Sequence, residues 1–287
     1  MKYSIKNSQI QIIVDTLGAE LVSLSKEGYE YMWSADARFW GRTSPVLFPI
    51  VGALKDNSYS YGGQRYQLPQ HGFARDREFK LIAQEENRLS FLLCDDAKTR
   101  ENYPFGFELS ISYILDASSV TIEYKVKNSD NKTLYFSLGT HPAFALELND
   151  TIGMQEYSLV FTQKEDAQRL LLDGALIGLQ KEPCLQGKEL QLYNGIFDKN
   201  ALVFDSIVSN EVKLQCKKST KSITVSYPNF PYIAFWSVPN APYICIEPWE
   251  GIADSVNASG QLEEKRGIKT LEVNEEFVRE MKIAITM

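Results

Sequence analysis

The chain has 287 residues, of which 44% are hydrophobic, 12% aromatic and 23% charged, a balance that supports a buried core and excludes a disordered chain. Its net charge of -7 argues against a nucleic-acid surface, which needs clustered Lys and Arg to displace counterions from phosphates. No signal-type apolar core opens the sequence, and no apolar run is long enough to span a membrane. We therefore expect no nucleic-acid partner and no membrane partner.

Four cysteines are scattered along the sequence without a CxxC pair: Cys94, Cys184, Cys216 and Cys245. Their even number leaves disulfides open, but buried reduced thiols are the commoner state in a large domain of this kind. We predict reduced thiols and a cytoplasmic location.

Alternation of apolar and polar residues, which is typical of half-buried strands, dominates the chain. In chain order, the clearest examples cover residues 109–115, 120–126, 223–227 and 281–285. Many short strands of this kind predict an all-β sandwich or barrel.

Turns and helices complete the expected organisation. Turn-type clusters at 61–64 and 128–131 predict connections between neighbouring antiparallel strands. Helical periodicity is limited to short pieces near 95–102 and 165–171. No linker, repeat or low-complexity tract divides the chain, so we predict a single domain over residues 1–287.

The chain contains only two histidines, and both lie among Gly and Pro residues. His71 stands in Leu68-Pro69-Gln70-His71-Gly72, and His141 stands in Gly139-Thr140-His141-Pro142 after the apolar run 134–138. Either one alone fits a buried structural histidine. Together they favour a site on a rigid scaffold, because histidine is the usual proton carrier near neutral pH.

A carboxylate follows an apolar strand near the C-terminal part of the chain. Glu247 ends the run Tyr243-Ile244-Cys245-Ile246 and is followed by Pro248 and Trp249. A carboxylate there needs hydrogen bonds or a cleft, which makes Glu247 a candidate general base. Trp249 offers a flat face to a sugar ring or simply packs in the core. The next carboxylate, Glu250, is expected to be solvated.

Four segments, in this order, resemble the aldose 1-epimerase (galactose mutarotase-like) family, and most closely its LacX-like branch near the hexose-6-phosphate 1-epimerases. They are residues 39–49 (FWGRTSPVLFP), 71–75 (HGFAR), 140–142 (THP) and 246–251 (IEPWEG). The resemblance implies an all-β, galactose mutarotase-like β-supersandwich. It also implies an isomerase that interconverts the α and β anomers of a hexose.

The roles of single residues follow from the same resemblance. It implies that His141 is the general acid, that Glu247 is the general base and that His71 helps to hold the sugar. A sugar-binding aspartate of the family matches Asp198, although Asp205 lies only seven residues further on. Either aspartate remains open, because Asp198 also reads as a turn residue.

Substrate choice is less determined. Residues 49–55 (PIVGALK) differ from the galactose mutarotases proper, so their hexose specificity does not transfer. Arg42 and Arg75 match arginines that hold phosphate in the hexose-6-phosphate branch, and each could equally pair with an acidic neighbour. A hexose-6-phosphate 1-epimerase is therefore the alternative, with a small sugar, free or phosphorylated, as the partner. The chain is expected to be a monomer or homodimer.

Anomer exchange needs an acid and a base on one bond. A carboxylate with a pKa of ~4.3 beside an imidazole of ~6.5 suits it, with the carboxylate holding the imidazole protonated. No cofactor is expected, since the chain lacks a phosphate-binding loop and a dinucleotide fingerprint. Three alternatives stay open: a metal site of two histidines and Glu247, a glycosidase, which would need a second carboxylate, and a noncatalytic sugar-binding protein.

Overall fold

One sheet of 15 strands runs through most of the protein in the computed structural model, which describes residues 1–287. Across the sheet the main path is β5 (Val46–Leu47), β13 (Gly139–Thr140), β21 (Tyr243–Trp249), β20 (Tyr232–Trp236), β17 (Leu202–Phe204), β15 (Tyr157–Asp173), β18 (Glu211–Cys216), β19 (Ser222–Ser226), β23 (Glu276–Thr286), β11 (Ser119–Asn128), β10 (Phe107–Asp116), β9 (Arg88–Cys94) and β8 (Lys80–Gln84). Two further strands leave this path: β14 (Ala143–Ala145) pairs with β21, and β16 (Leu176–Gln191) pairs with β15.

Smaller elements surround the large sheet. A four-stranded sheet contains β1 (Lys2–Lys6), β2 (Gln11–Asp15), β3 (Glu20–Lys26) and β4 (Tyr29–Glu30). Two isolated pairs are β6 (Ser58–Tyr61) with β7 (Gln64–Gln67), and β12 (Leu134–Phe136) with β22 (Lys269–Leu271). Helical structure is limited to α1 (Ala97–Asn102) and the 3-10 turns Lys55–Asn57, Ala74–Asp76, Met154–Glu156 and Leu262–Glu264. The all-β fold class is confirmed.

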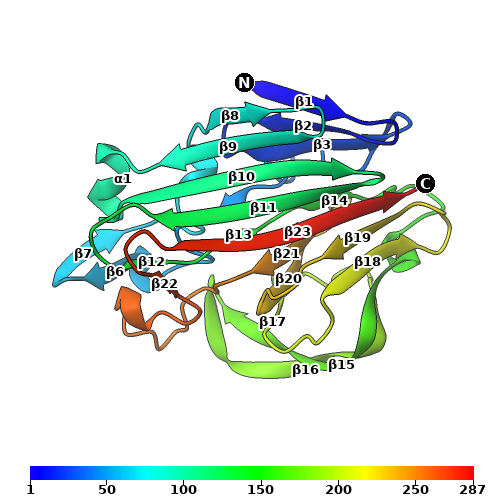
Figure 1. Ribbon diagram of the computed structural model, residues 1–287. Coiled ribbons are helices and arrows are strands. Elements are labelled where there is room, and N and C mark those ends of the chain that lie inside the picture. Colours follow the sequence, from blue (N-terminus) through cyan, green and yellow to red (C-terminus); the bar gives the residue numbers. More distant parts are fainter.

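The alternation in the sequence sets the register of the central strands. In the β10–β11 pair Leu109 lies opposite Val126 and Ile111 opposite Tyr124, and all four side chains are buried. Apolar residues of β2 and β3 join the same core cluster, so the four-stranded sheet packs against the large one. In Figure 1 the strands β9, β10, β11 and β23 run side by side, and the β15–β16 ribbon curves away beneath them.

Two of the local expectations are wrong. Residues 165–171 have helix-forming side chains but lie in β15, because they pair with β16 and bury alternate residues such as Glu165, Ala167 and Arg169. The cluster at 128–131 does not join neighbouring strands: it leads from β11 to β12, whose partner is β22. By contrast, 61–64 forms the β6–β7 turn. The other helical piece forms α1, with Asp96 in a capping box.

Strand β21 presents different residues on its two faces, as a period of two requires. Ile244 and Ile246 belong to the large core, whereas Cys245 and Trp249 belong to two smaller apolar clusters. Glu247 lies between Cys245 and Trp249 in this alternation, so it points away from the main core. No helix is long and apolar enough to cross a bilayer. All four cysteines are free thiols.

Candidate active site

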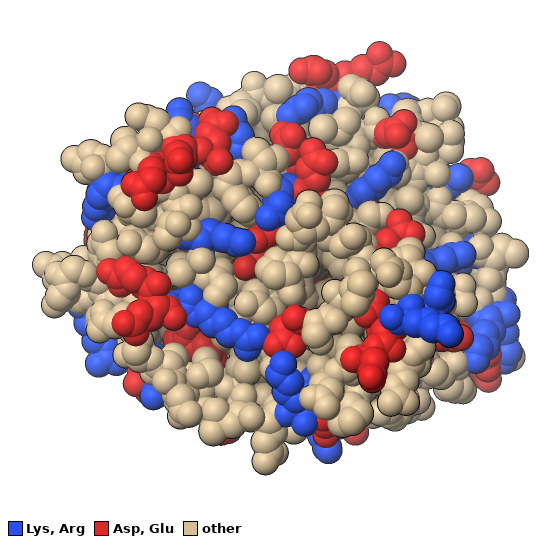
Figure 2. All heavy atoms as spheres, turned by 60° about the horizontal axis from the view of Figure 1, so that its bottom comes forward, with Lys and Arg blue, Asp and Glu red and all other residues tan.

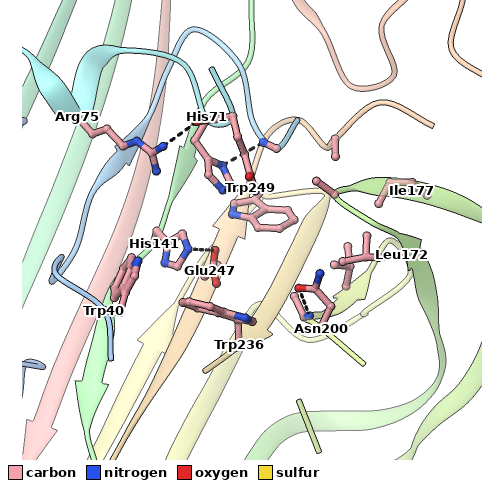
Figure 3. Close-up of a pocket in the computed structure, with 16 residues that line it drawn as sticks. Trp40, His71, Arg75, His141, Leu172, Ile177, Asn200, Trp236, Glu247 and Trp249 are labelled. Carbon is pink, nitrogen blue, oxygen red and sulfur yellow. Dashed lines mark hydrogen bonds and ion pairs between the residues drawn. The ribbon is translucent and has the colours of Figure 1, made fainter. Parts of the chain in front are cut away.

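A cavity of about 380 Å³ lies over the face of β21 that carries Glu247. Figure 3 shows acid–base groups near its centre, an arginine on one side and apolar side chains on the opposite side. Its lining residues are Trp40, Gly52, Gln70, His71, Arg75, His141, Leu172, Ala175, Ile177, Asn200, Ala201, Val203, Trp236, Glu247, Trp249 and Ala253. The structure therefore brings five of the predicted site residues together: His71, Arg75, His141, Glu247 and Trp249.

His141 and Glu247 are in direct contact. The Nε2 atom of His141 lies 3.2 Å from Oε2 of Glu247, and both side chains are buried. His141 lies between β13 and β14, both of which pair with β21, the strand of Glu247. Three elements of the same sheet thus hold the pair, so its geometry does not depend on a loose loop.

Burial determines where the proton of this pair resides. It raises the pKa of Glu247 well above its usual value, and the Trp249 indole opposes this only in part. Burial, with a smaller contribution from the positive charges of Arg75 and Arg42, also lowers the pKa of His141 to about 3. Burial therefore favours a neutral carboxylic acid beside a neutral imidazole. The expectation that the carboxylate keeps His141 protonated is wrong for this state, because desolvation outweighs the attraction.

Two tryptophans hold the His141 ring in place. The indole of Trp40 stacks on it with ring centroids 4.8 Å apart and an angle of 27° between the planes. The indole of Trp236 meets it edge-on at 5.8 Å and 88°. The imidazole has little freedom to turn away from Glu247, and an aromatic face also favours a protonated ring through cation–π attraction.

His71 is fixed by the backbone of a neighbouring loop. The N–H of Gly52 donates to its Nδ1 at 3.1 Å, so the neutral ring carries its proton on Nε2. Burial lowers the pKa of His71 well below its usual value. His71 has φ +68°, and a side chain at Gly72 would lie 2.3 Å from the carbonyl oxygen of Phe48. The His-Gly pair therefore reflects a tight turn that presents a neutral N–H donor.

The two arginines have different places. Arg75 lines the cavity, and its Nη2 donates to the carbonyl oxygen of Gln70 at 2.8 Å while its buried Nε has no partner. Arg42 does not line the cavity; it pairs at 2.7 Å with the exposed Asp76. Arg75 also lies 3.9 Å from Asp76, so two cations share one carboxylate beside the cavity.

Neither candidate aspartate reaches the cavity. Asp198 is exposed and lines a separate shallow hollow with Tyr193 and Gly195. Asp205 pairs with Lys181 at 2.9 Å and with Arg266 at 2.6 Å. The polar side chain that reaches the cavity from this region is Asn200, because the turn after Asp198 directs it there. Asp198 was expected to bind the sugar, but it lies outside the cavity.

A family model described as aldose 1-epimerase matches residues 1–282 of the chain. The chain belongs to the aldose 1-epimerase family. Among its relatives, the plasmid-encoded protein LacX of Lactococcus lactis subsp. lactis is 34% identical over 277 residues, which cover 92% of this chain and 93% of that protein.

Solved structures agree with this family assignment. A galactose mutarotase related enzyme from Lactobacillus acidophilus is 32% identical and superposes with a TM-score of 0.96 over 100% of this chain and 98% of the other. A galactose mutarotase-like protein from Lactobacillus casei is 29% identical with a TM-score of 0.95, and each chain is covered to 100%. The galactose mutarotase-like supersandwich, predicted from sequence, is confirmed.

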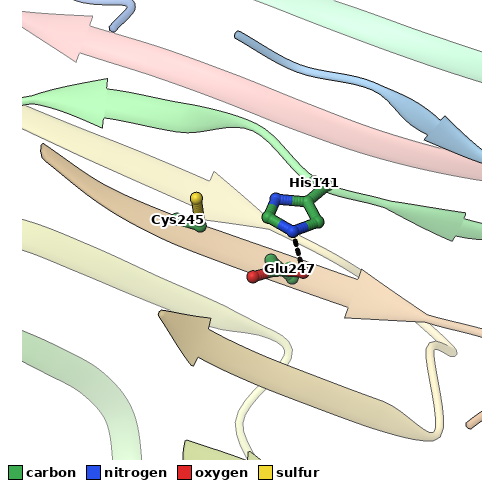
Figure 4. A group of neighbouring side chains, drawn as sticks. All are labelled: His141, Cys245 and Glu247. Carbon is green, nitrogen blue, oxygen red and sulfur yellow. Dashed lines mark ion pairs between the residues drawn. The ribbon is translucent and has the colours of Figure 1, made fainter. Parts of the chain in front are cut away.

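The chain also groups donor atoms that could bind a metal, but they are not the two histidines and Glu247 that the sequence left open as an alternative. His141, Cys245 and Glu247 have one donor atom each within 4.8 Å of the others (Figure 4). His71 is outside this group, since its Nδ1 accepts from Gly52. Burial raises the pKa of Cys245 well above its usual value, so its thiol holds its proton. The donor set is a poor match for a metal that needs a thiolate.

The surface of this family member mixes charges of both signs. On the face in Figure 2, Lys and Arg side chains alternate with Asp and Glu side chains around a tan centre, and no continuous basic stripe crosses it. Glu250 is not at this surface: it is 0% exposed and bonded to Arg279 and Lys269. The expectation that Glu250 is solvated is wrong, because two cations from β22 and β23 satisfy its charge inside the protein.

Several lining residues were not predicted as site residues. Trp40 stands in the 39–49 segment of the family resemblance, and Gln70 precedes His71, so both had a signal in the sequence. Trp236 shares its strand face with Ala234, opposite Cys245 and Glu247 in β21, which only the pairing of β20 with β21 reveals. The apolar wall of Leu172, Ile177 and Val203 comes from β15, β16 and β17, which are distant in sequence from both His141 and Glu247.

Proposed function

We propose that this chain is an aldose 1-epimerase that interconverts the α and β anomers of a hexose. The observation that carries the proposal is the contact of His141 with Glu247 inside a cavity large enough for a sugar. Both groups can exchange protons with a bound molecule there, because both line the cavity. The location we propose is the cytoplasm, as the sequence predicts.

The reaction needs one proton on the pair, and the pair holds one. When that proton moves from Glu247 to His141 across their 3.2 Å contact, it leaves a carboxylate and an imidazolium. The carboxylate then takes the proton of the C1 hydroxyl while the imidazolium gives its proton to the ring oxygen. The C1–O5 bond breaks, the carbonyl forms at C1, and the C1–C2 bond rotates. Reclosure on the other face returns both protons.

The remaining polar groups suit a binding role. His71 offers its Nε2–H as a donor with a tautomer set by Gly52, the Gln70 amide lies 3.3 Å from that nitrogen, and Asn200 adds polar atoms at another point of the wall. Trp249 presents an indole ring to the cavity (Figure 3), where it can cover the apolar face of a sugar. None of these steps requires a cofactor.

A second candidate, a hexose-6-phosphate 1-epimerase, is favoured by Arg75. This guanidinium lines the cavity, and its buried Nε makes no hydrogen bond and lies 3.9 Å from the exposed Asp76, so it has a free donor to offer a phosphate oxygen. The charges of Arg75 and Arg42 lower the pKa of His141. A bound phosphate would offset that field and so favour the imidazolium that the reaction uses.

The direct test is anomer equilibration. Fresh single anomers of several free hexoses and hexose 6-phosphates are mixed with the purified protein, and the approach to equilibrium is followed by polarimetry or NMR. Acceleration beyond the spontaneous rate supports an epimerase, and the best substrate decides between the two candidates. Saturable binding without acceleration would instead make the protein a noncatalytic sugar binder on the same fold.

A further inference from the structure

A buried ion pair next to the cavity-lining residue Ala253 has no part in the proposed reaction. Asp254 is 4% and Lys265 is 6% exposed, and their side chains meet with Nζ 2.8 Å from Oδ1. The same Nζ donates to the carbonyl oxygen of Ile252 at 2.7 Å. Burying two charges is costly unless further hydrogen bonds satisfy them, and both members of this pair make such bonds to the backbone.

Asp254 is hydrogen-bonded to the loop that contains Gly52, the residue whose N–H fixes His71. Its Oδ2 accepts from the N–H of Lys55 at 3.0 Å, and its own N–H donates to the carbonyl oxygen of Ala53 at 2.9 Å. These contacts hold both sides of residue 54, two residues after Gly52. Gly52 itself packs so tightly on this segment that an added Cβ would lie 2.4 Å from the Cβ of Ala253.

Asp254 is also hydrogen-bonded to the opposite wall of the cavity. Its carbonyl oxygen accepts from the N–H of Ile177 at 2.8 Å, and the Ile177 carbonyl accepts from Val256 at 3.0 Å. Ile177 is the apolar residue that β16 contributes to the cavity. One residue that does not line the cavity therefore joins three segments that do, through Gly52, Ala253 and Ile177.

We propose that Asp254, neutralised by Lys265, is a positioning residue that holds His71 and the β15–β16 wall in register for sugar binding. This role rests on the proposed function, since the wall and His71 matter only if a sugar occupies the cavity. His141 and Glu247 lie on β13–β14 and β21 and do not contact Asp254, so they are held independently.

The two-histidine composition gives a direct test. In a ¹⁵N-labelled protein only two imidazoles contribute side-chain signals, and the Nδ1 of His71 reports its bond from Gly52. In Asp254→Asn we expect the His71 signal to move while the His141 signal stays, KM for the hexose to rise on the order of tenfold, and kcat to change less than about twofold. If this variant does not fold, the double variant Asp254→Asn with Lys265→Met, which removes the stranded cation, is used instead.

Glu165→Gln is the matched control. Glu165 is also buried and accepts two backbone N–H groups, from Val208 at 2.9 Å and Ser209 at 2.8 Å, but it lies outside the cavity. It should lower stability without moving either imidazole signal or KM. An unchanged His71 signal and KM in a folded Asp254 variant would overturn the proposal, and so would equal movement of both histidines. The imidazole signals need no turnover, so a failure of the epimerase proposal is seen separately.

Discussion

Two buried carboxylates in one short segment, Glu247 and Glu250, have opposite kinds of partner. Glu250 is surrounded by the cations Arg279 and Lys269, whereas Glu247, three residues earlier and equally buried, has a neutral imidazole as its close partner. Glu250 is held in two ion pairs that no bound sugar needs to disturb. Glu247 has no cation to satisfy its charge, so burial raises its pKa and it keeps a proton that it can give away. Burial alone does not distinguish a structural acid from a reactive one; the partner does.

The largest effect is expected at the imidazole of the reactive pair. His141→Asn removes the group that protonates the ring oxygen, so kcat should fall ~10²–10⁴-fold. His71→Asn should raise KM as well, since it removes a donor to the sugar. Steady-state anomerisation kinetics of both variants check this. A His141→Asn enzyme with a wild-type kcat would exclude His141 as the acid.

Glu250→Gln tests the structural role that the comparison gives to Glu250. It leaves Arg279 and Lys269 without their carboxylate, which should cost about 2 kcal/mol in the free energy of unfolding. The side chain does not line the cavity, so kcat of the folded protein should be retained. Urea denaturation with parallel kinetics measures both quantities. A large loss of kcat with unchanged stability would reverse the roles assigned to the two glutamates.

Arg75→Ala should separate the two candidate substrates. If a phosphorylated sugar is used, KM for the hexose 6-phosphate should rise on the order of tenfold, while KM for the free hexose changes little. Added salt should weaken only the phosphorylated substrate. Arg42→Ala is the comparison, and its effect should be smaller because Arg42 pairs with Asp76 and does not line the cavity. Equal losses for both sugars would make Arg75 a general contact.

The smallest effect concerns stability at different pH values. The folded pKa of Glu247 is raised, so its contribution to stability is fully present below the unfolded value of ~4.3 and is lost as the pH rises through the folded value. A difference of one in pKa is worth about 1.4 kcal/mol. Glu247→Gln avoids this loss, so its Tm should gain on the wild type as the pH rises from 4 to 9. A pH-independent difference would show that Glu247 is not held protonated by burial.

The acid–base residues of the cavity could be predicted from the sequence more fully than the strands that form its walls. His71 and His141 could be found because histidine is rare in this chain and both lie beside Gly or Pro, and Glu247 because it follows an apolar run. The alternation in 109–115 and 120–126 predicted the central strands. The ribbon of β15 and β16 could not be found in the same way. Residues 165–171 favour a helix locally, and only long-range pairing makes them a strand.

Long-range contacts explain the other differences too. Whether Asp198 or Asn200 reaches the cavity depends on a turn that places neighbours in opposite directions, and residue type does not report it. Glu250 reads as a surface residue because its cations come from β22 and β23, about 20 to 30 residues away. The sequence also could not show which member of the His141–Glu247 pair holds the proton, because that depends on how deeply each side chain is buried.

The central claim is that Glu247 exchanges a proton with the sugar, and Glu247→Gln tests it most directly. The substitution keeps the size and polarity of the side chain but cannot accept the C1 hydroxyl proton. With a hexose at equilibrium, NMR exchange spectroscopy measures the α-to-β rate, and a titration of the same sample measures sugar binding. We predict near wild-type affinity with an exchange rate reduced ~10²–10⁴-fold. A folded Glu247→Gln protein that binds the sugar and exchanges its anomers at the wild-type rate would contradict the account.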